Sequence, residues 1–140
     1  MKLVTNTKRI ARRLELAGRA ALLSTHRSQR HGAILVKGGS ILSVGCNHPD
    51  FSKHAGLHRD YTEYNVGSLH AEIAALRGLP KNVTQGSIAY VVRLGNVFGE
   101  FRMSMPCQMC LSALYVADVK RVVFSVNATD IASVTPGEYF

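Results

Sequence analysis

The fold of this 140-residue chain is decided by two segments, Ser68-Leu69-His70-Ala71-Glu72 and Met105-Pro106-Cys107-Gln108-Met109-Cys110. Cys107 and Cys110 are three residues apart, so on a helix their side chains share a face and can hold one ion as thiolates. His70 adds an imidazole to this pair. Three protein ligands leave the fourth tetrahedral position open for water, as in catalytic zinc sites. The two segments therefore predict a Zn²⁺ site made of His70, Cys107 and Cys110.

Glu72 is predicted to be the catalytic residue beside this metal. It lies two residues after His70, about 200° further around an ideal helix, so it is poorly placed as a fourth ligand. Zinc lowers the pKa of a bound water toward neutrality and makes that water a nucleophile. A carboxylate next to the water can carry its proton.

Each segment alone has simpler interpretations. A Cys-x-x-Cys pair can form a structural zinc site, a redox pair or two buried core thiols. A His-x-Glu triplet often does no more than open a helix. The combination, with Pro106 before the first Cys and a helical pattern after each half, favours a catalytic metal site over these alternatives.

The same combination, His-x-Glu with Pro-Cys-x-x-Cys, is the signature of zinc-dependent nucleobase deaminases. The chain resembles the cytidine and deoxycytidylate deaminase superfamily over about residues 7–126. Residues 70–77 are similar to the corresponding helix of tRNA adenosine deaminases, and residues 45–49 are similar to a turn that precedes the His motif in several branches. The resemblance implies a cytidine deaminase-like fold and a hydrolytic deaminase, and it leaves the substrate open.

The composition predicts one domain covering residues 1–140, long enough to bury a core. Hydrophobic residues make up 46%, and no apolar run approaches the length of a membrane span. The first thirty residues are too basic and polar for a signal-peptide core, so we expect no secretion. Three Cys, an odd number, argue against a disulfide framework and favour a thiolate metal site in a reducing cytoplasm.

Positive charge is concentrated near the N-terminus. Residues 1–30 hold eight of the 17 Lys and Arg residues but only one acidic residue, Glu15. Apolar residues at helical spacing predict a helix over residues 7–24. Four basic side chains lie off its apolar stripe: Lys8, Arg9, Arg12 and Arg13. They form either a solvated outer face or a surface for the phosphates of a nucleic acid, and delivery of a nucleic-acid substrate would require them to face the mouth of the active site.

The remaining pattern predicts a mixed sheet. Apolar runs at residues 33–36 and 41–44 flank Gly38-Gly39, a tight hairpin signal, and further strands are expected at residues 86–94 and 121–126. Helices are expected from Ser68 to before Pro80 and after Pro106. Because helices connect the last two strands, these should be parallel. The expected fold class is a three-layer α/β/α sandwich with an antiparallel hairpin at one edge and the two metal-bearing helices side by side.

Substrate contacts are predicted on both sides of the metal. The resemblance implies that Asn47 contacts a sugar hydroxyl, whereas the alternative is an Asn that serves only its own turn. The backbone N–H of Ala71 or Cys107, at a helix start, is a candidate donor to the base.

Residues 48–67 show no clean periodicity and form a long predicted loop. Some deoxycytidylate deaminases bind a second, structural zinc in this region, which here would use Cys46, His54 and His58. Because no second Cys is nearby, we favour a loop that walls the pocket, with His48 or Arg59 as a contact for a phosphate.

The resemblance implies hydrolytic removal of a nucleobase amino group, with Glu72 carrying the proton to the leaving amine. We favour cytosine in a free cytidine or deoxycytidine nucleotide or nucleoside, because the long segment after Asn47 resembles that of deoxycytidylate deaminases. One alternative is an adenosine or cytidine deaminase acting on tRNA or single-stranded nucleic acid, although Met105 stands where tRNA adenosine deaminases carry Glu. Another is a zinc-containing binding protein without catalysis. We also expect a cytoplasmic homo-oligomer that does not act at a membrane.

Overall fold

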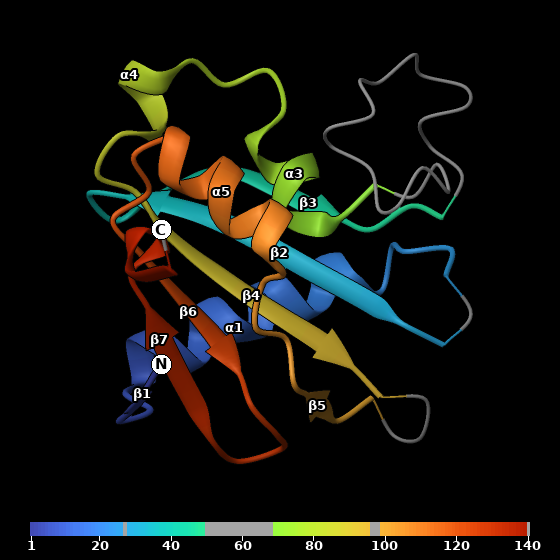
Figure 1. Cartoon of the computed structure of the whole chain (residues 1–140). Coiled ribbons are helices and arrows are strands. Elements are labelled where there is room, and N and C mark those ends of the chain that lie inside the picture. Colours follow the sequence, from blue (N-terminus) through green and yellow to red (C-terminus); the bar gives the residue numbers. More distant parts are fainter. Residues whose placement is uncertain (27, 50–68, 96–98, 140) are drawn as a thin grey trace.

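The computed structural model describes residues 1–26, 28–49, 69–95 and 99–139. Its centre is a seven-stranded sheet in the order β1-β7-β6-β4-β2-β3, with β5 paired to β4 (Figure 1). The strands are β1 (Lys2–Val4), β2 (Arg30–Lys37), β3 (Ser40–Cys46), β4 (Ile88–Leu94), β5 (Phe101–Arg102), β6 (Arg121–Ser125) and β7 (Ile131–Val134). The helices are α1 (Lys8–Ala21), α3 (Ala71–Leu76), α4 (Lys81–Thr84), α5 (Gln108–Val116) and the 3₁₀ helix η3 (Pro136–Tyr139).

The sheet is mixed, as the sequence predicts. Strands β4 and β6 are parallel, whereas β2 is antiparallel to both β3 and β4. The β2–β3 hairpin turns at Gly38 and Gly39, whose φ angles of 58° and 84° lie in the left-handed region that glycine favours. Strand β3 forms one edge of the sheet.

Helices cover both faces of the sheet, which confirms the α/β sandwich. Helix α1 lies on one face, and α3 and α5 lie on the other (Figure 1). The side chains of β2 alternate between two cores: Ile34 and Val36 pack with α1, whereas Ala33 and Leu35 pack on the side of α3 and α5. Within the described part of the chain, no helix has the length and hydropathy needed to cross a membrane.

The observed helices are shorter than predicted. Helix α1 begins after Thr7, whose side chain accepts a hydrogen bond from the N–H of Ile10, and it ends at Ala21. The helix expected to run to Pro80 ends at Leu76, because Arg77 is extended and Gly78 has a φ of 79°. Strand β1 was missed, because its three residues carry no periodic signal and are held by pairing with β7.

An irregularity in β3 changes which face its side chains occupy. Leu35 pairs with Ser43 but Val36 pairs with Ile41, so Leu42 is an extra residue in the ladder. Ser43 faces α3, where its Oγ donates to the carbonyl of Ala75 at 2.6 Å. Ile41 shares the opposite face with Val36.

Helix α3 lies directly against β3 at Gly45. A Cβ atom at this position would lie 2.5 Å from the carbonyl oxygen of Ala71 and 2.5 Å from the nitrogen of Ala75. The absence of a side chain at Gly45 therefore sets the distance between the strand and the helix.

Candidate active site

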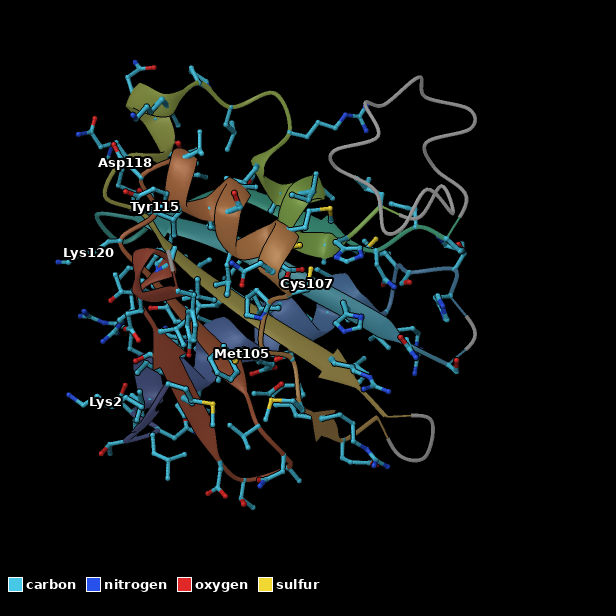
Figure 2. All side chains as sticks on the ribbon, viewed as in Figure 1. Lys2, Met105, Cys107, Tyr115, Asp118 and Lys120 are labelled. Carbon is cyan, nitrogen blue, oxygen red and sulfur yellow. The ribbon has the colours of Figure 1, made fainter. Side chains whose placement is uncertain are left out.

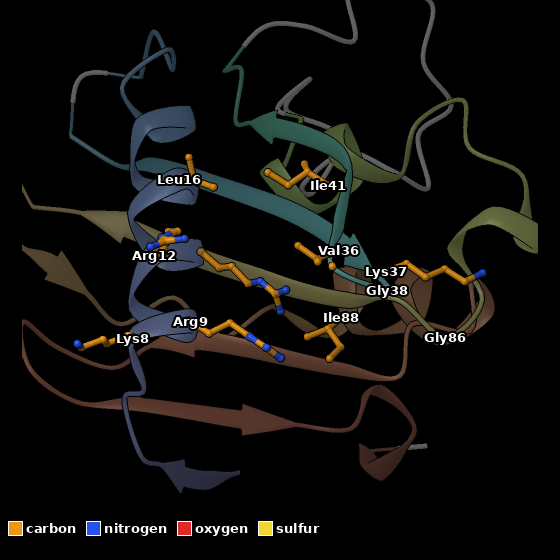
Figure 3. Close-up of a pocket in the computed structure, with 12 residues that line it drawn as sticks. Lys8, Arg9, Arg12, Leu16, Val36, Lys37, Gly38, Ile41, Gly86 and Ile88 are labelled. Atoms are coloured by element: carbon orange, nitrogen blue, oxygen red, sulfur yellow. The ribbon is translucent and has the colours of Figure 1, made fainter.

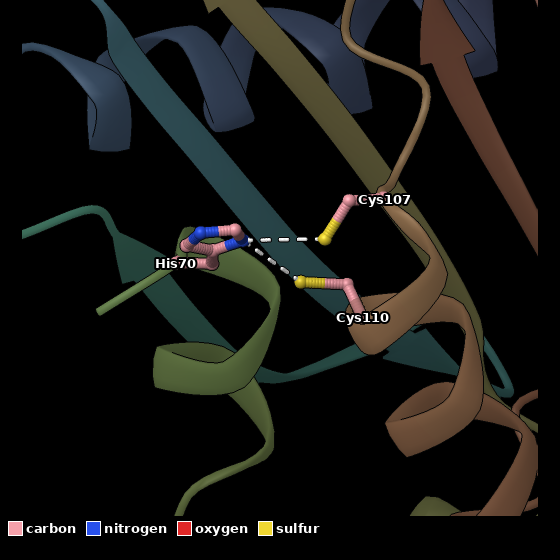
Figure 4. Close-up of side chains that lie close together, drawn as sticks. All are labelled: His70, Cys107 and Cys110. Atoms are coloured by element: carbon pink, nitrogen blue, oxygen red, sulfur yellow. Dashed lines mark hydrogen bonds between the residues drawn. The ribbon is translucent and has the colours of Figure 1, made fainter. Parts of the chain in front are cut away.

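The predicted metal ligands come together at two helix starts. His70 immediately precedes α3 and Cys107 immediately precedes α5, and neither side chain caps its own helix. Cys110 lies one turn into α5, on the same side as Cys107 (Figure 4). The connection that leads into α5 carries Met105 and Cys107 and crosses the sheet near β4 and β6 (Figure 2).

The three ligand atoms have the spacing of a tetrahedral metal site. His70 Nδ1 lies 3.2 Å from Cys110 Sγ and 3.6 Å from Cys107 Sγ (Figure 4). Zinc bonds of the usual length at a tetrahedral angle place nitrogen and sulfur about 3.5 Å apart. Among the residues that the structure describes, this is the group of His, Cys, Asp or Glu side chains compact enough to hold an ion. The donor set and its spacing fit Zn²⁺.

The pKa values of the Cys107 and Cys110 thiols are shifted in opposite directions. The thiol of Cys110 donates a hydrogen bond to Cys107, and this bond together with His70 lowers the pKa of Cys107 to about 4 against the opposing effect of burial. The same hydrogen bond, followed by burial, raises the pKa of Cys110. Without metal, the exposed Cys107 therefore holds the thiolate and the buried Cys110 holds the proton.

A cavity of about 200 Å³ opens beside the ligands. Its lining combines residues from the segment that leads into β2, the start of β2, the residue after β3, the start of α3 and the connection before α5: His26, Gln29, His31, Asn47, His70, Ala71, Glu72, Ser104, Met105 and Cys107. Most of these side chains are polar, so the cavity suits a small ligand with several hydrogen-bonding groups.

Glu72 is buried in the wall of this cavity, with 6% of its surface exposed. Burial raises the pKa of Glu72, and hydrogen bonding to its own backbone and the charge of His70 oppose this effect without cancelling it. A raised pKa makes the carboxylate a better proton acceptor, and the protonated carboxyl can still release that proton. A bound cation would lower this pKa again.

The family follows from this geometry together with the comparisons. The family model described as "Cytidine and deoxycytidylate deaminase zinc-binding region" matches residues 6–126, which include all three ligands and Glu72. The chain belongs to the cytidine and deoxycytidylate deaminase family. No curated protein matches the sequence at a significant level.

Solved structures share the fold of this family member. The dCMP deaminase of cyanophage S-TIM5 in its apo form is 26% identical, with a TM-score of 0.63 over 87% of this chain and 86% of that chain. The same enzyme in complex with dCMP and dUMP is 25% identical, with a TM-score of 0.61 over 86% and 83%. A cytidine deaminase from Burkholderia pseudomallei has a TM-score of 0.61 over 95% of both chains, but at 20% identity it supports the fold alone.

Asn47 lines the cavity of the deaminase but is also part of its framework. Its Oδ1 accepts a hydrogen bond from the N–H of His31 at 2.8 Å, and its Nδ2 donates to the carbonyl of Gln29 at 2.7 Å. Its own carbonyl accepts from the hydroxyl of Ser24 at 2.9 Å. These bonds tie the end of β3 to the start of β2, so the side chain does more than serve its own turn.

Ala71 and His48 occupy different positions relative to the site. Ala71 is fully buried in the cavity wall, at the first position of α3. His48 forms an isolated bridge with Leu69, and its Nε2 lies 3.5 Å from Cys46 Sγ, but it does not line the cavity. Cys46 is buried at the end of β3.

The other predicted contacts of the long loop, Arg59, His54 and His58, lie outside the described residues. The second structural zinc therefore stays a prediction.

Sequence reasoning missed the cavity residues on the strand side, Gln29 and two histidines. His31 has its pKa lowered to about 4, mainly by burial and then by the charge of Arg93, so it is neutral at physiological pH. Nδ1 of His26 accepts hydrogen bonds from the N–H groups of Ser28 and Gln29, at 3.2 and 3.1 Å. The hairpin offered a signal for both, because the start of its first strand must lie beside Asn47 at the end of its second.

Ser104 was missed as well, and it joins two strands to the metal-bearing segment. Its buried hydroxyl bonds to the carbonyl oxygen of Val91 at 2.9 Å and to the hydroxyl of Ser125 at 2.8 Å. The parallel pairing of β4 and β6 ends at Val91 and Phe124. Ser104 therefore lies where these strands separate, three residues before Cys107.

The basic residues of α1 do not face this cavity. Lys8, Arg9, Arg12 and Arg13 belong to the layer on the opposite side of the sheet (Figure 1). The requirement for delivery of a nucleic-acid substrate within one chain is therefore not met.

Proposed function

We propose that this chain removes the amino group of cytosine in a free cytidine or deoxycytidine nucleotide or nucleoside, by zinc-dependent hydrolysis. The observation that carries the proposal is the burial of Glu72 in a small polar cavity beside three ligand atoms with zinc spacing. The preference for a free nucleotide is supported by the likeness to a phage enzyme whose structure holds dCMP and dUMP. The distance of the basic helix from the cavity argues against a polymer substrate.

The metal would be held by His70, Cys107 and Cys110. Zinc at this position supplies the activation of water as a nucleophile. To bind the metal, the two cysteines must be thiolates and the imidazole of His70 must be neutral. The two helix starts that carry them would be fixed relative to one another by the shared ion.

Glu72 moves the protons of the reaction. Its carboxylate accepts a proton from the attacking water and later releases one to the departing amino group, so that water and cytosine give uracil and ammonia. Burial keeps the carboxyl away from bulk solvent and favours its neutral form between the two transfers.

Asn47 and Ala71 would orient the substrate. The N–H of Ala71 lies in the first turn of α3, where backbone donors have no partner within the helix, so it can donate to the base. The Oδ1 of Asn47 has a second lone pair that can accept from a sugar hydroxyl while the bond to His31 is kept.

The test is ammonia release from cytidine, deoxycytidine, their monophosphates, adenosine and a short single-stranded oligonucleotide, with the zinc-loaded protein. We expect turnover of one of the free cytosine compounds. Glu72→Gln is the matched control, because it keeps the shape of the side chain and should keep the zinc while turnover falls about 10²–10⁴-fold. Turnover of adenosine or the oligonucleotide alone would contradict the substrate, and loss of zinc in Glu72→Gln would contradict the role of Glu72.

The proposal includes one domain over residues 1–140, a cytoplasmic location and a homo-oligomer. Free thiols suit a reducing compartment. An apolar cavity of about 410 Å³ between α3, α4 and α5, lined in part by the exposed Val116, supports association through this face. Light scattering of the purified chain would test the oligomer, and a monomer at micromolar concentration would contradict it.

A further inference from the structure

A basic groove lies on the face of the sheet opposite the zinc site. It has a volume of about 870 Å³ and runs between α1 and the β2–β3 hairpin (Figure 3). Its lining residues are Lys8, Arg9, Arg12, Arg13, Leu16, Val36, Lys37, Gly38, Gly39, Ile41, Gly86 and Ile88. Five of these residues are Lys or Arg, and none is acidic.

The guanidinium groups of α1 differ in how firmly they are held. Arg13 donates to the hydroxyl of Tyr90 at 2.8 Å and lies over the Tyr90 ring, 5.4 Å from its centre. Arg9 extends from α1 toward Ile88 (Figure 3). Arg9 and Arg12 are exposed, and within the described ranges neither makes a hydrogen bond or an ion pair. At the far end of the groove, Nζ of Lys37 donates to the carbonyl groups of Asn82 and Val83.

The clustering of positive charges at the start of α1 destabilises this helix. Lys8 and Arg9 lie in the first turn, where the helix dipole favours acidic residues, and that turn holds none. Arg9 also precedes Arg12 and Arg13 by three and four residues, the spacings at which like charges repel on a helix. A bound anion would relieve both effects, which points to a ligand with several negative charges.

The apolar floor of the groove indicates which kind of polyanion can bind there. It is formed by Leu16, Val36, Ile41 and Ile88, and 48% of the surface of Ile41 is exposed. A ligand with phosphates at the rim and flat, weakly polar groups on the floor would satisfy both parts of the surface. Single-stranded nucleic acid combines a regular series of phosphates with exposed bases.

We propose that this basic groove binds the backbone of a single-stranded nucleic acid. Because the sheet separates the groove from the cavity of Glu72, the bound strand does not present its bases to the zinc site of the same chain. The groove is thus a binding surface for a partner of the deaminase, and this inference does not depend on which nucleotide is the substrate.

The test is the salt dependence of binding, measured by fluorescence anisotropy with a labelled single-stranded oligonucleotide. Each phosphate contact contributes about 0.7 to the slope of log K against log salt, so Arg9→Gln combined with Arg12→Gln should lower the slope by about 1.4. Between 50 and 200 mM salt, the affinity of the wild type should therefore fall about sevenfold more than that of the variant. Both side chains are exposed and their charges are unfavourable for α1, so the variant should keep the zinc content and should melt no lower than the wild type.

The matched control combines Lys2→Gln and Lys120→Gln, which removes two positive charges from exposed positions outside the groove (Figure 2). This variant should keep the wild-type slope, and equal losses in both variants would mean that binding follows net charge and would overturn the proposal. Inorganic tripolyphosphate should compete poorly at equal phosphate concentration, whereas equal competition would identify a site for small anions instead. Competitive inhibition of nucleotide turnover by the oligonucleotide would place it in the zinc cavity and would also overturn the proposal.

Discussion

Gly45→Ala tests whether the close contact between β3 and α3 holds the active site in place. The new Cβ atom would lie 2.5 Å from backbone atoms of Ala71 and Ala75, whereas ordinary contacts begin at 3.4 Å. Because both neighbours are helix backbone, no side-chain rotation relieves the clash, and α3 must move away from β3 by about 1 Å. Helix α3 carries Glu72 and follows His70, so the proton carrier and one ligand move with it.

The expected magnitude has two parts. Overpacking of this kind costs about 1–3 kcal/mol, and each kcal/mol lowers the melting temperature of a domain of this size by about 2–4 °C. A displacement of 1 Å at a reacting group costs roughly 100-fold in turnover. The assays are thermal unfolding followed by circular dichroism and ammonia release from the nucleotide substrate, both at saturating zinc.

Gly18→Ala is the matched control for Gly45→Ala. Its Cβ atom would approach only the ring of Phe101, at 3.3 Å, and this side chain can move by the few tenths of an ångström required. Gly18 lies within α1, where alanine is the better helix former. Stability and turnover should therefore stay close to the wild type. A Gly45→Ala protein with the wild-type melting temperature and turnover would refute the reasoning, because it would show that α3 is not constrained by β3.

Three further predictions concern individual side chains. Cys110→Ser should lose the zinc while Cys46→Ser keeps it, as measured by metal analysis, and zinc loss from Cys46→Ser would instead support a second structural site. Asn47→Ala should lower the free energy of unfolding by about 1–3 kcal/mol in urea titrations, because it removes two partly buried hydrogen bonds that join the end of β3 to the start of β2; an unchanged stability would contradict its framework role. The folded-state pKa of His31, about 4, lies below its ordinary value of 6.5, so the unfolded chain binds a proton first as the pH falls. Stability should therefore be full above pH 6.5 and should fall toward pH 4, by at most about 3 kcal/mol because His31 is partly exposed, and urea titrations of His31→Gln should show a flatter dependence on pH.

The metal ligands could be predicted because their signal is local. Cys107 and Cys110 are one helical turn apart. Pro106 marks the start of this helix and so places Cys107 at the helix N-terminus. Only the approach of His70 to this pair of cysteines depends on the fold, and the combined His-x-Glu and Pro-Cys-x-x-Cys motif predicted that approach. The β2–β3 hairpin was predictable for the same reason, since two adjacent glycines determine its turn.

Other residues of the cavity, among them His31 and Ser104, have no such local signal. His31 can be inferred only indirectly, from the pairing of β2 with β3. Ser104 reaches the cavity where β4 separates from β6, and no nearby residue in the sequence indicates this separation. The topology of the sheet likewise determines that the basic residues of α1 lie on the face opposite the zinc cavity. A charge pattern on a helix does not say which face of the sheet the helix will cover.

The extra residue Leu42 in β3 makes the length of this strand matter more than its composition. On one side of it Ile41 faces the basic groove, and on the other side Ser43 and Gly45 face α3. Removing one residue here would restore the simple alternation of side chains between the two faces of the sheet. The side chains of half of the strand would then move to the other face. Either Ile41 would leave the groove or a side chain would be forced under α3. During evolution, substitutions at the exposed Val44 should therefore accumulate freely, whereas a single-codon insertion or deletion in β3 should be purged.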